Sequence, residues 1–310
     1  WYVPYLESST ARLKISAWLD GSVIANAYSK LDFSISVEKA FPNTAWVDVT
    51  NEATAHGERQ DFGMSWADYD NDGWVDLYCS GPGTNALLKN QSGTFVRSTI
   101  EEVEDGGVGR AAVWGDYDDD GYLDLFVANI GCNKLYHNYN GVGFSELSLS
   151  VFSISDATFG ATWVDYDNDG DLDLYYVNAG GDTNKLLENV GGSFVRVQNG
   201  GPLEYVGECV GAAWGDYDND GDQDVYLSNY GEGNLLLKNM GGGEFIDVTD
   251  GYLGDSGNGK GAIWGDFDND GDLDLYIINF GSENKLFLNE GHDDEFTMVS
   301  LPDQSGYLFS

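Results

Sequence analysis

Five short segments of this sequence carry aspartates at alternate positions, in the pattern D-x-D-x-D-G-x-x-D. The first of them places Asp68, Asp70, Asp72 and Asp76 around Gly73. Carboxylates at alternate positions converge when the backbone curls tightly, and a glycine at position six permits the curl because it adopts positive φ without steric cost. Converging carboxylates are the usual way for a short loop to bind a cation.

The pattern recurs every 48 to 51 residues, and each copy offers the same ligand positions. Positions one, three, five and nine supply carboxylates, while position seven supplies its backbone carbonyl oxygen. The candidate metal ligands are Asp68, Asp70, Asp72, Trp74 and Asp76; Asp116, Asp118, Asp120, Tyr122 and Asp124; Asp165, Asp167, Asp169, Asp171 and Asp173; Asp216, Asp218, Asp220, Asp222 and Asp224; and Asp266, Asp268, Asp270, Asp272 and Asp274. The glycines at position six are Gly73, Gly121, Gly170, Gly221 and Gly271.

The ligand types favour Ca²⁺ among the common metals. Oxygen ligands in a flexible loop suit Ca²⁺ better than Mg²⁺, which requires a stricter octahedron, and the absence of His and Cys from the loops argues against Zn²⁺. An EF-hand would need a glutamate at position twelve, which is instead Cys79, Val127, Tyr176, Leu227 or Ile277. We therefore expect about five Ca²⁺ ions, one per loop, that stabilise the fold rather than catalyse, because Ca²⁺ activates water poorly beside Zn²⁺.

Strands must flank each loop to hold its ligands in place. In the fourth repeat, apolar, β-branched or aromatic segments at 210–217, 222–229, 234–239 and 244–249 are separated by the loop and by glycine turns. Four strands in a period near 50 residues are typical of a propeller blade. We expect an all-β fold, a β-propeller of four-stranded antiparallel blades near 61–101, 109–150, 158–199, 209–250 and 259–301, with six or seven blades in the complete ring.

The same pattern of strands can be followed toward both ends of the sequence. Residues 1–43 lack the aspartate motif, but 11–18, 22–28 and 31–39 resemble strands of a degenerate, metal-free blade that 44–50 would complete. The alternative is the end of a preceding β-domain. The propeller then spans 44–310, with 295–301 as the last fourth strand, so the chain ends where a further first strand is expected.

Composition excludes some classes of partner. The 53 acidic and 14 basic residues give a net charge of −39, which would repel nucleic acid and anionic membranes. No apolar run reaches 18 residues, so we expect no membrane insertion. The three cysteines, Cys79, Cys132 and Cys209, show no metal-ligand spacing and leave one disulfide plus a free thiol as an open alternative.

The repeats resemble the FG-GAP/VCBS repeat family found in integrin α-subunits and in many secreted or surface proteins. The resemblance rests on W-G-D-Y-D-N-D-G-D-x-D-L-Y followed by N-x-G, L-x-x-N and F-x-D-V-T, and it covers residues 44–301. It implies a propeller, usually of seven blades, whose loops between first and second strands bind Ca²⁺ on one rim. It also implies an extracellular, secreted or cell-surface location; some relatives are fungal lectins.

The opposite rim is the expected recognition surface, because its inter-blade loops vary between repeats. These loops are 53–63, 101–110, 153–160, 204–211 and 251–261. Candidate ligand residues on them are His56, Arg59, Arg110, Tyr205, Tyr252 and Lys260, joined by the aromatic Phe159. The alternative is that the charges neutralise nearby carboxylates and the aromatic rings pack at blade edges.

The recurring Trp66, Trp114, Trp163, Trp214 and Trp264 are expected in the core. Asn90-Gln91-Ser92 is a candidate N-glycosylation sequon.

Together these features predict a non-enzymatic extracellular recognition or adhesion module that binds glycan or protein. One alternative is a structural subunit of a surface filament or appendage that packs on neighbouring subunits. The other is a polysaccharide-degrading enzyme on a propeller scaffold. Catalysis has little support, because His56, His137 and His292 lie in different repeats and no catalytic motif is present.

Overall fold

The computed structural model describes residues 12–19, 22–32, 61–104, 106–152, 156–198, 201–291 and 296–300. The chain divides into two compact units, Trp1–Val49 and Thr50–Ser310. In the first unit, β1 (Arg12–Leu19) pairs antiparallel with β2 (Ser22–Asp32). The third strand was expected at 31–39, but its first two residues end β2; the rest of that segment and the strand expected at 44–50 lie outside the described residues.

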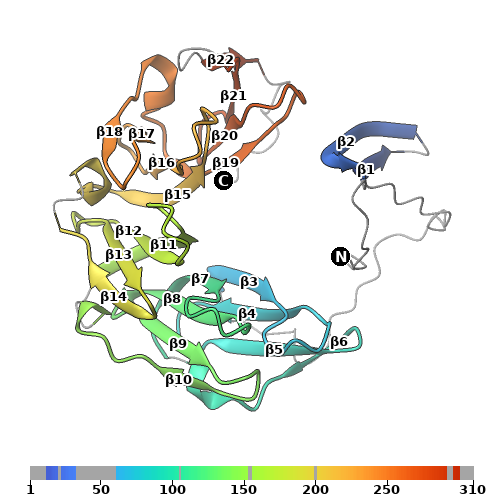
Figure 1. Ribbon diagram of the computed structural model, residues 1–310, viewed down its shortest axis with the longest axis vertical. Coiled ribbons are helices and arrows are strands. Elements are labelled where there is room, and N and C mark those ends of the chain that lie inside the picture. The colour runs from blue at the N-terminus through green and yellow to red at the C-terminus, as the bar shows by residue number, and fades with distance from the viewer. Residues whose placement is uncertain are drawn as a thin grey trace. The chain divides into compact units, whose positions relative to one another are not determined.

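The second unit repeats one four-stranded pattern five times, and we call the four strands of each repeat a blade (Figure 1). Blade 1 comprises β3 (Gly63–Ala67), β4 (Asp76–Ser80), β5 (Ala86–Gln91) and β6 (Thr94–Arg97). Blade 2 comprises β7 (Gly109–Gly115), β8 (Asp124–Gly131), β9 (Lys134–Asn138) and β10 (Phe144–Glu146). Blade 3 comprises β11 (Asp156–Val164), β12 (Asp173–Asn178), β13 (Lys185–Val190) and β14 (Ser193–Arg196). Blade 4 comprises β15 (Cys209–Gly215), β16 (Asp224–Asn229), β17 (Leu235–Asn239) and β18 (Phe245–Asp247). Blade 5 comprises β19 (Gly259–Gly265), β20 (Asp274–Asn279), β21 (Lys285–Asn289) and β22 (Phe296–Val299).

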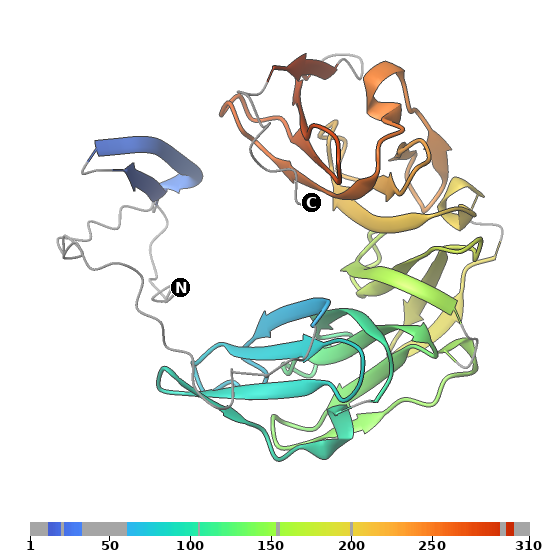
Figure 2. The same cartoon turned by 180° about the vertical axis from the view of Figure 1, so that it is seen from behind.

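Within each blade, consecutive strands pair antiparallel, as expected from the sequence. The first strands of neighbouring blades lie side by side, from β3 through β7, β11 and β15 to β19 (Figures 1 and 2). Blades 2 and 3 are additionally joined, because the end of β8 pairs with the start of β11 at Gly131–Asp156 and Ile130–Ala157. The all-β, propeller-like arrangement therefore places all five aspartate loops in equivalent positions, between first and second strands.

The second strands are buried on both faces, which explains their nearly continuous apolar sequence. All residues of β4, β12 and β16 are buried. Four of the five core clusters are shared by two blades: Tyr117 and Phe126 of blade 2 pack with Leu174 and Tyr176 of blade 3, for example. The second strand of one blade is thus fixed against its neighbour, and the loop that precedes it is held firmly.

The connections between blades differ from expectation in two ways. Short 3-10 turns form at η1 (Glu101–Val103), η2 (Ser150–Phe152), η3 (Gly201–Glu204) and η4 (Gly251–Gly254). The last residues of the predicted loops 101–110, 153–160, 204–211 and 251–261 belong to the first strands, because pairing with the second strand continues past a bulge such as Gly109/Ala111 or Gly259/Gly261. Among the described residues, no helix has the length and apolar character to cross a membrane.

Two further expectations are corrected. Trp66 is 58% exposed, whereas the other four tryptophans of the series are half-buried and pack against core clusters as predicted. Trp66 belongs to the first described blade, so it lacks the contact that Tyr69, Tyr117 and Tyr217 give to the tryptophan of the following blade. None of Cys79, Cys132 and Cys209 forms a disulfide, so the alternative of one disulfide bond is not realised.

Candidate metal centres

The backbone of each aspartate loop is folded around its own carboxylates. In the first loop, the position-one carboxylate of Asp68 accepts hydrogen bonds from the N–H groups of Asp72 (3.0 Å) and Gly73 (2.9 Å). Gly73 has φ of 89° and Asn71 has φ of 56°, so two residues adopt the left-handed conformation that the curl requires. The same two bonds recur in the second, third and fourth loops.

This curl brings together the carboxylates of positions one, three and nine. One oxygen from each lies within 4.8 Å of the others in the first four loops, in the groups Asp68, Asp70 and Asp76; Asp116, Asp118 and Asp124; Asp165, Asp167 and Asp173; and Asp216, Asp218 and Asp224. The position-five carboxylate accepts a hydrogen bond from the N–H of position seven, at 2.9 Å from Trp74 to Asp72. A ligand role for the position-seven carbonyl stays a prediction.

The position-nine aspartate is the buried anchor of each site. In the third loop, Asp173 is fully buried and accepts hydrogen bonds from the N–H groups of Tyr166 (3.3 Å) and Asn189 (2.7 Å). Burial raises the pKa of Asp173 to about 7, and burial likewise raises the pKa of Asp76 to about 6. A buried carboxylate whose ionised form is disfavoured by desolvation gains most from a nearby cation.

The buried carboxylate oxygens of the loops that accept no hydrogen bond fit a divalent cation. The Oδ1 atoms of the position-three residues Asp70 and Asp167 are buried and accept no hydrogen bond. Unpaired carboxylate oxygens are costly inside a protein, and oxygen clusters of this kind are what Ca²⁺ binds. Several of the aspartate groups are therefore consistent with Ca²⁺ binding, with positions one, three and nine as the residues that would hold the ion.

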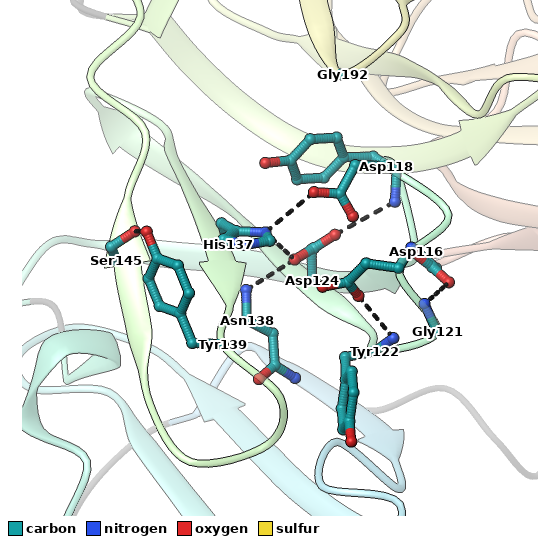
Figure 3. Close-up of polar contacts among 12 residues, drawn as sticks. Asp116, Asp118, Gly121, Tyr122, Asp124, His137, Asn138, Tyr139, Ser145 and Gly192 are labelled. Atoms are coloured by element: carbon teal, nitrogen blue, oxygen red, sulfur yellow. Dashed lines mark hydrogen bonds and ion pairs between the residues drawn. The ribbon is translucent and has the colours of Figure 1, made fainter.

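One position close to the sites was missed from the sequence. The residue before the last asparagine of the third strand lies opposite the position-nine aspartate in every blade; it is Lys89, His137, Glu188, Lys238 or Leu288. In blade 2, His137 Nδ1 lies 3.3 Å from Asp118 Oδ2 and 3.2 Å from Asp124 Oδ1 (Figure 3). The L-x-x-N motif marks this position, but only the strand register shows that it faces the loop.

An asparagine at or next to the end of the third strand links each of blades 2 to 5 to the preceding blade. Its N–H binds the position-nine aspartate, and its Nδ2 donates to the carbonyl of position two in the loop of the previous blade. These bonds to the previous blade are Asn138 to Tyr69 (2.8 Å), Asn189 to Tyr117 (2.7 Å), Asn239 to Tyr166 (2.8 Å) and Asn289 to Tyr217 (2.7 Å). Each metal centre is therefore tied to two blades.

A second contact joins neighbouring loops directly. The position-four side chains of Asn168 and Asn219 donate to Asp222 (2.7 Å) and Asp272 (2.7 Å) of the following loops, and Asn71 donates to the Gly121 carbonyl (2.9 Å). The second loop has Asp119 at this position. An ionised aspartate cannot donate a hydrogen bond, so the junction of the second and third loops lacks this contact.

The candidate rim residues do not form one site. His56 and Arg59 lie outside the described residues. Arg110 lies on β7 with its guanidinium over the rings of Phe62 (4.4 Å) and Phe159 (4.9 Å). Lys260 lies on β19 over Tyr230 (4.5 Å) and Phe280 (5.6 Å). These are two separate groups of a cation between aromatic rings.

The other two candidates on this rim differ in environment. Tyr205 donates from its hydroxyl to Glu232 (3.0 Å), and burial together with this bond raises the pKa of Tyr205 to about 12. Tyr252 in η4 is 68% exposed. Asn90 lies next to the end of β5 as the equivalent of Asn138, and its Nδ2 donates to the Val75 carbonyl (3.0 Å), so a glycan on Asn90 would replace that bond.

Comparison with known proteins agrees with this arrangement. The sequence matches the FG-GAP-like repeat at residues 68–127, 116–176 and 216–277. These matches span more than half of the chain, which therefore belongs to the FG-GAP-like repeat family. No curated protein matches the sequence significantly.

Three solved structures are similar to this chain to different degrees. The chain is similar to an Agrocybe aegerita lectin, with a TM-score of 0.58 and 18% identity over 81% of this chain and 69% of the lectin. It is also similar to BBS1N in complex with ARL6DN, with a TM-score of 0.47 and 13% identity over 79% and 68% of the two chains. A third similarity is to the Photorhabdus luminescens Tc holotoxin pore, with a TM-score of 0.39 and 16% identity over 88% of this chain and 12% of that one. The lectin supports the propeller-like fold of this chain.

Proposed function

We propose that this chain is a non-enzymatic propeller module, stabilised by Ca²⁺ outside the cell, that recognises glycans through the rim opposite its aspartate loops. The support for the metal is the repeated geometry: four loops each bring three carboxylates together through the same hydrogen bonds. Identical sites in successive blades suit stabilisation, whereas a catalytic site is usually singular. Extracellular Ca²⁺-binding modules have dissociation constants on the order of 10⁻⁴–10⁻³ M, and an affinity of this order is enough for loops that stabilise the fold.

The support for recognition is the environment of two basic side chains. Among the described residues, the other lysines and arginines of the blades pair with carboxylates, as Lys134 does with Glu146 (2.6 Å). Arg110 and Lys260 instead lie over aromatic rings, and Phe62 is 46% and Phe280 50% exposed beside them. Exposed rings next to cations that no described carboxylate neutralises are suited to stack on a sugar and to donate hydrogen bonds to its hydroxyl or acidic groups.

The lectin comparison suggests the first ligand to test. The Agrocybe aegerita lectin is described as recognising non-reducing terminal N-acetylglucosamine. That property belongs to the lectin, and at 18% identity it offers this chain only a starting point. We further infer that the complete ring has six or seven blades, since five described blades continue from one another without a closing contact among the described strands.

A glycan array in Ca²⁺-containing buffer tests the proposal. Selective binding is expected, and Lys260→Met should weaken it at least severalfold, while Lys134→Met, with the same charge change away from this rim group, should leave it unchanged. Absence of binding to every glycan would refute the recognition role and favour a protein partner or a filament subunit. Turnover of any arrayed polysaccharide would refute the non-enzymatic role.

A further inference from the structure

The five aspartate loops are nearly identical, but the side chain that faces each of them from the third strand is not. Lys89 and Lys238 are cationic, Glu188 is anionic, and His137 and Leu288 bring no fixed charge. All five occupy the same register position, opposite the buried position-nine aspartate. The third-strand side chain therefore adds a charge difference to loops that are themselves similar, with four aspartates in the first loop and five in each of the others.

The two lysines reach the ligand carboxylates themselves. The Lys89 ammonium contacts Asp70 at position three and lies 3.2 Å from Asp72 at position five. Lys238 contacts Asp218 and lies 3.5 Å from Asp220 in the fourth loop. The contacted side chain of Asp70 is only 11% exposed, so this pair is not weakened by solvent as a surface ion pair would be.

Glu188 reverses the charge at the same place in the third loop. Tyr166 is the second residue of this loop, and its pKa is raised first by burial and then by the charges of Asp167 and Glu188. The Glu188 carboxylate therefore lies near the loop. The buried Oδ1 of Asp167 has no hydrogen-bond partner in this loop. The third loop has five aspartates, and Glu188 adds a sixth carboxylate where the first and fourth loops contain an ammonium group.

We propose that this third-strand residue sets the Ca²⁺ affinity of each loop, with Glu188 making the third loop the tightest site and Lys89 and Lys238 making the first and fourth the weakest. The inference rests on the Ca²⁺ binding included in the proposed function. A cation that enters the first loop must displace the lysine or remain beside it, and both cost binding free energy. The lysines in turn neutralise their loops when Ca²⁺ is scarce, so blades 1 and 4 depend least on the metal.

Hydrogen–deuterium exchange of each loop, followed during a titration of the chelated protein with Ca²⁺ alone, tests this site by site. The N–H groups bound to the position-one carboxylates report whether a loop is ordered. The third loop should become protected at the lowest Ca²⁺ concentration, and the fifth loop at a higher one. The first and fourth loops should show the smallest change in protection and should need about tenfold more Ca²⁺ than the third.

Substitutions test whether the third-strand residue itself determines the Ca²⁺ affinity of its loop. Lys89→Met keeps the aliphatic stem and should lower the Ca²⁺ midpoint of the first loop about tenfold, whereas Leu288→Lys should raise that of the fifth loop by a similar factor. Lys134→Met makes the same charge change away from any loop and should move no midpoint. If Lys89→Met does not fold, Leu288→Lys and the order of the Ca²⁺ midpoints in the unaltered chain still test the proposal.

The outcomes separate this inference from the proposed function. Equal midpoints in all loops, or a folded Lys89→Met protein with an unmoved first loop, would overturn the affinity order and leave Ca²⁺ binding intact. A chain whose loops do not respond to Ca²⁺ at all would overturn both.

Discussion

The side-chain amide of Asn239 donates a hydrogen bond of 2.8 Å to the backbone carbonyl of Tyr166, one repeat earlier in the chain. The same asparagine donates through its N–H to Asp224 (2.8 Å) and accepts from Gly241 (3.1 Å). One fully buried residue thus connects the third strand of blade 4, its own aspartate loop and the loop of blade 3. Metal site and blade interface are built from the same contacts.

Replacement of this asparagine should therefore destabilise the protein strongly. Asn239→Ala leaves the Tyr166 carbonyl and the Gly241 N–H without partners, and we expect a loss of roughly 3 kcal/mol in the free energy of unfolding. Denaturant titration measures the loss. Asn90→Ala in blade 1 is the matched control and should cost clearly less, because the one bond that its side chain donates among the described residues stays within its own blade, to Val75. Equal costs would argue against the inter-blade bond as the source of stability.

The second loop offers a stabilising change. Asp119 has φ of 56° and occupies the position where Asn168 and Asn219 donate to the next loop. Asp119→Asn should add such a bond and should suit the left-handed conformation, with a gain of about 1 kcal/mol and a rise in Tm of a few degrees. The reverse change, Asn168→Asp, should lower the Tm by a comparable amount. A drop in the Tm of Asp119→Asn would contradict the proposed contact.

Removal of metal should lower thermal stability. An excess of chelator is expected to reduce the Tm by several degrees, because Ca²⁺ binds the folded loops and not the unfolded chain. Readdition of Ca²⁺ should restore the Tm, and the same concentration of Mg²⁺ should restore less of it, since Mg²⁺ requires stricter octahedral geometry. Differential scanning calorimetry checks both. An unchanged melting curve in chelator is incompatible with structural Ca²⁺.

The thiols should differ in reactivity with pH. Cys132 is exposed and should react with a thiol reagent in the native protein, whereas Cys79 and Cys209 are buried. Burial raises the pKa of Cys209 to about 12, so its thiol stays protonated and unreactive as the pH is raised through the range where an ordinary thiol ionises. Absorbance titration should count one thiol in native protein and three in denaturant, and none in native Cys132→Ser. Rapid native labelling of a second thiol would show that the core opens.

The sequence alone determined the repeated unit, the strands and the ligand-bearing loops. These features are local: nine consecutive residues contain the alternating aspartates and the glycine, and alternation of turns and apolar segments marks the strands. The FG-GAP-like repeat family was identified on the same local motif. The ends of the inter-blade loops were placed less well, because pairing with the second strand past a bulge extends the first strands into them.

Only the tertiary structure decided how the repeats act on one another. Strand register placed Lys89 and Glu188 against loops some twenty residues away, and blade packing brought Asn239 to Tyr166; the repeat marks these positions but does not show what they contact. The exposure of Trp66 also followed from its neighbours and not from its motif, which it shares with four half-buried tryptophans. A local pattern specifies which groups can bind a cation, because they are close in the chain. Contacts between blades depend on side chains far apart in sequence, and folding alone brings those together.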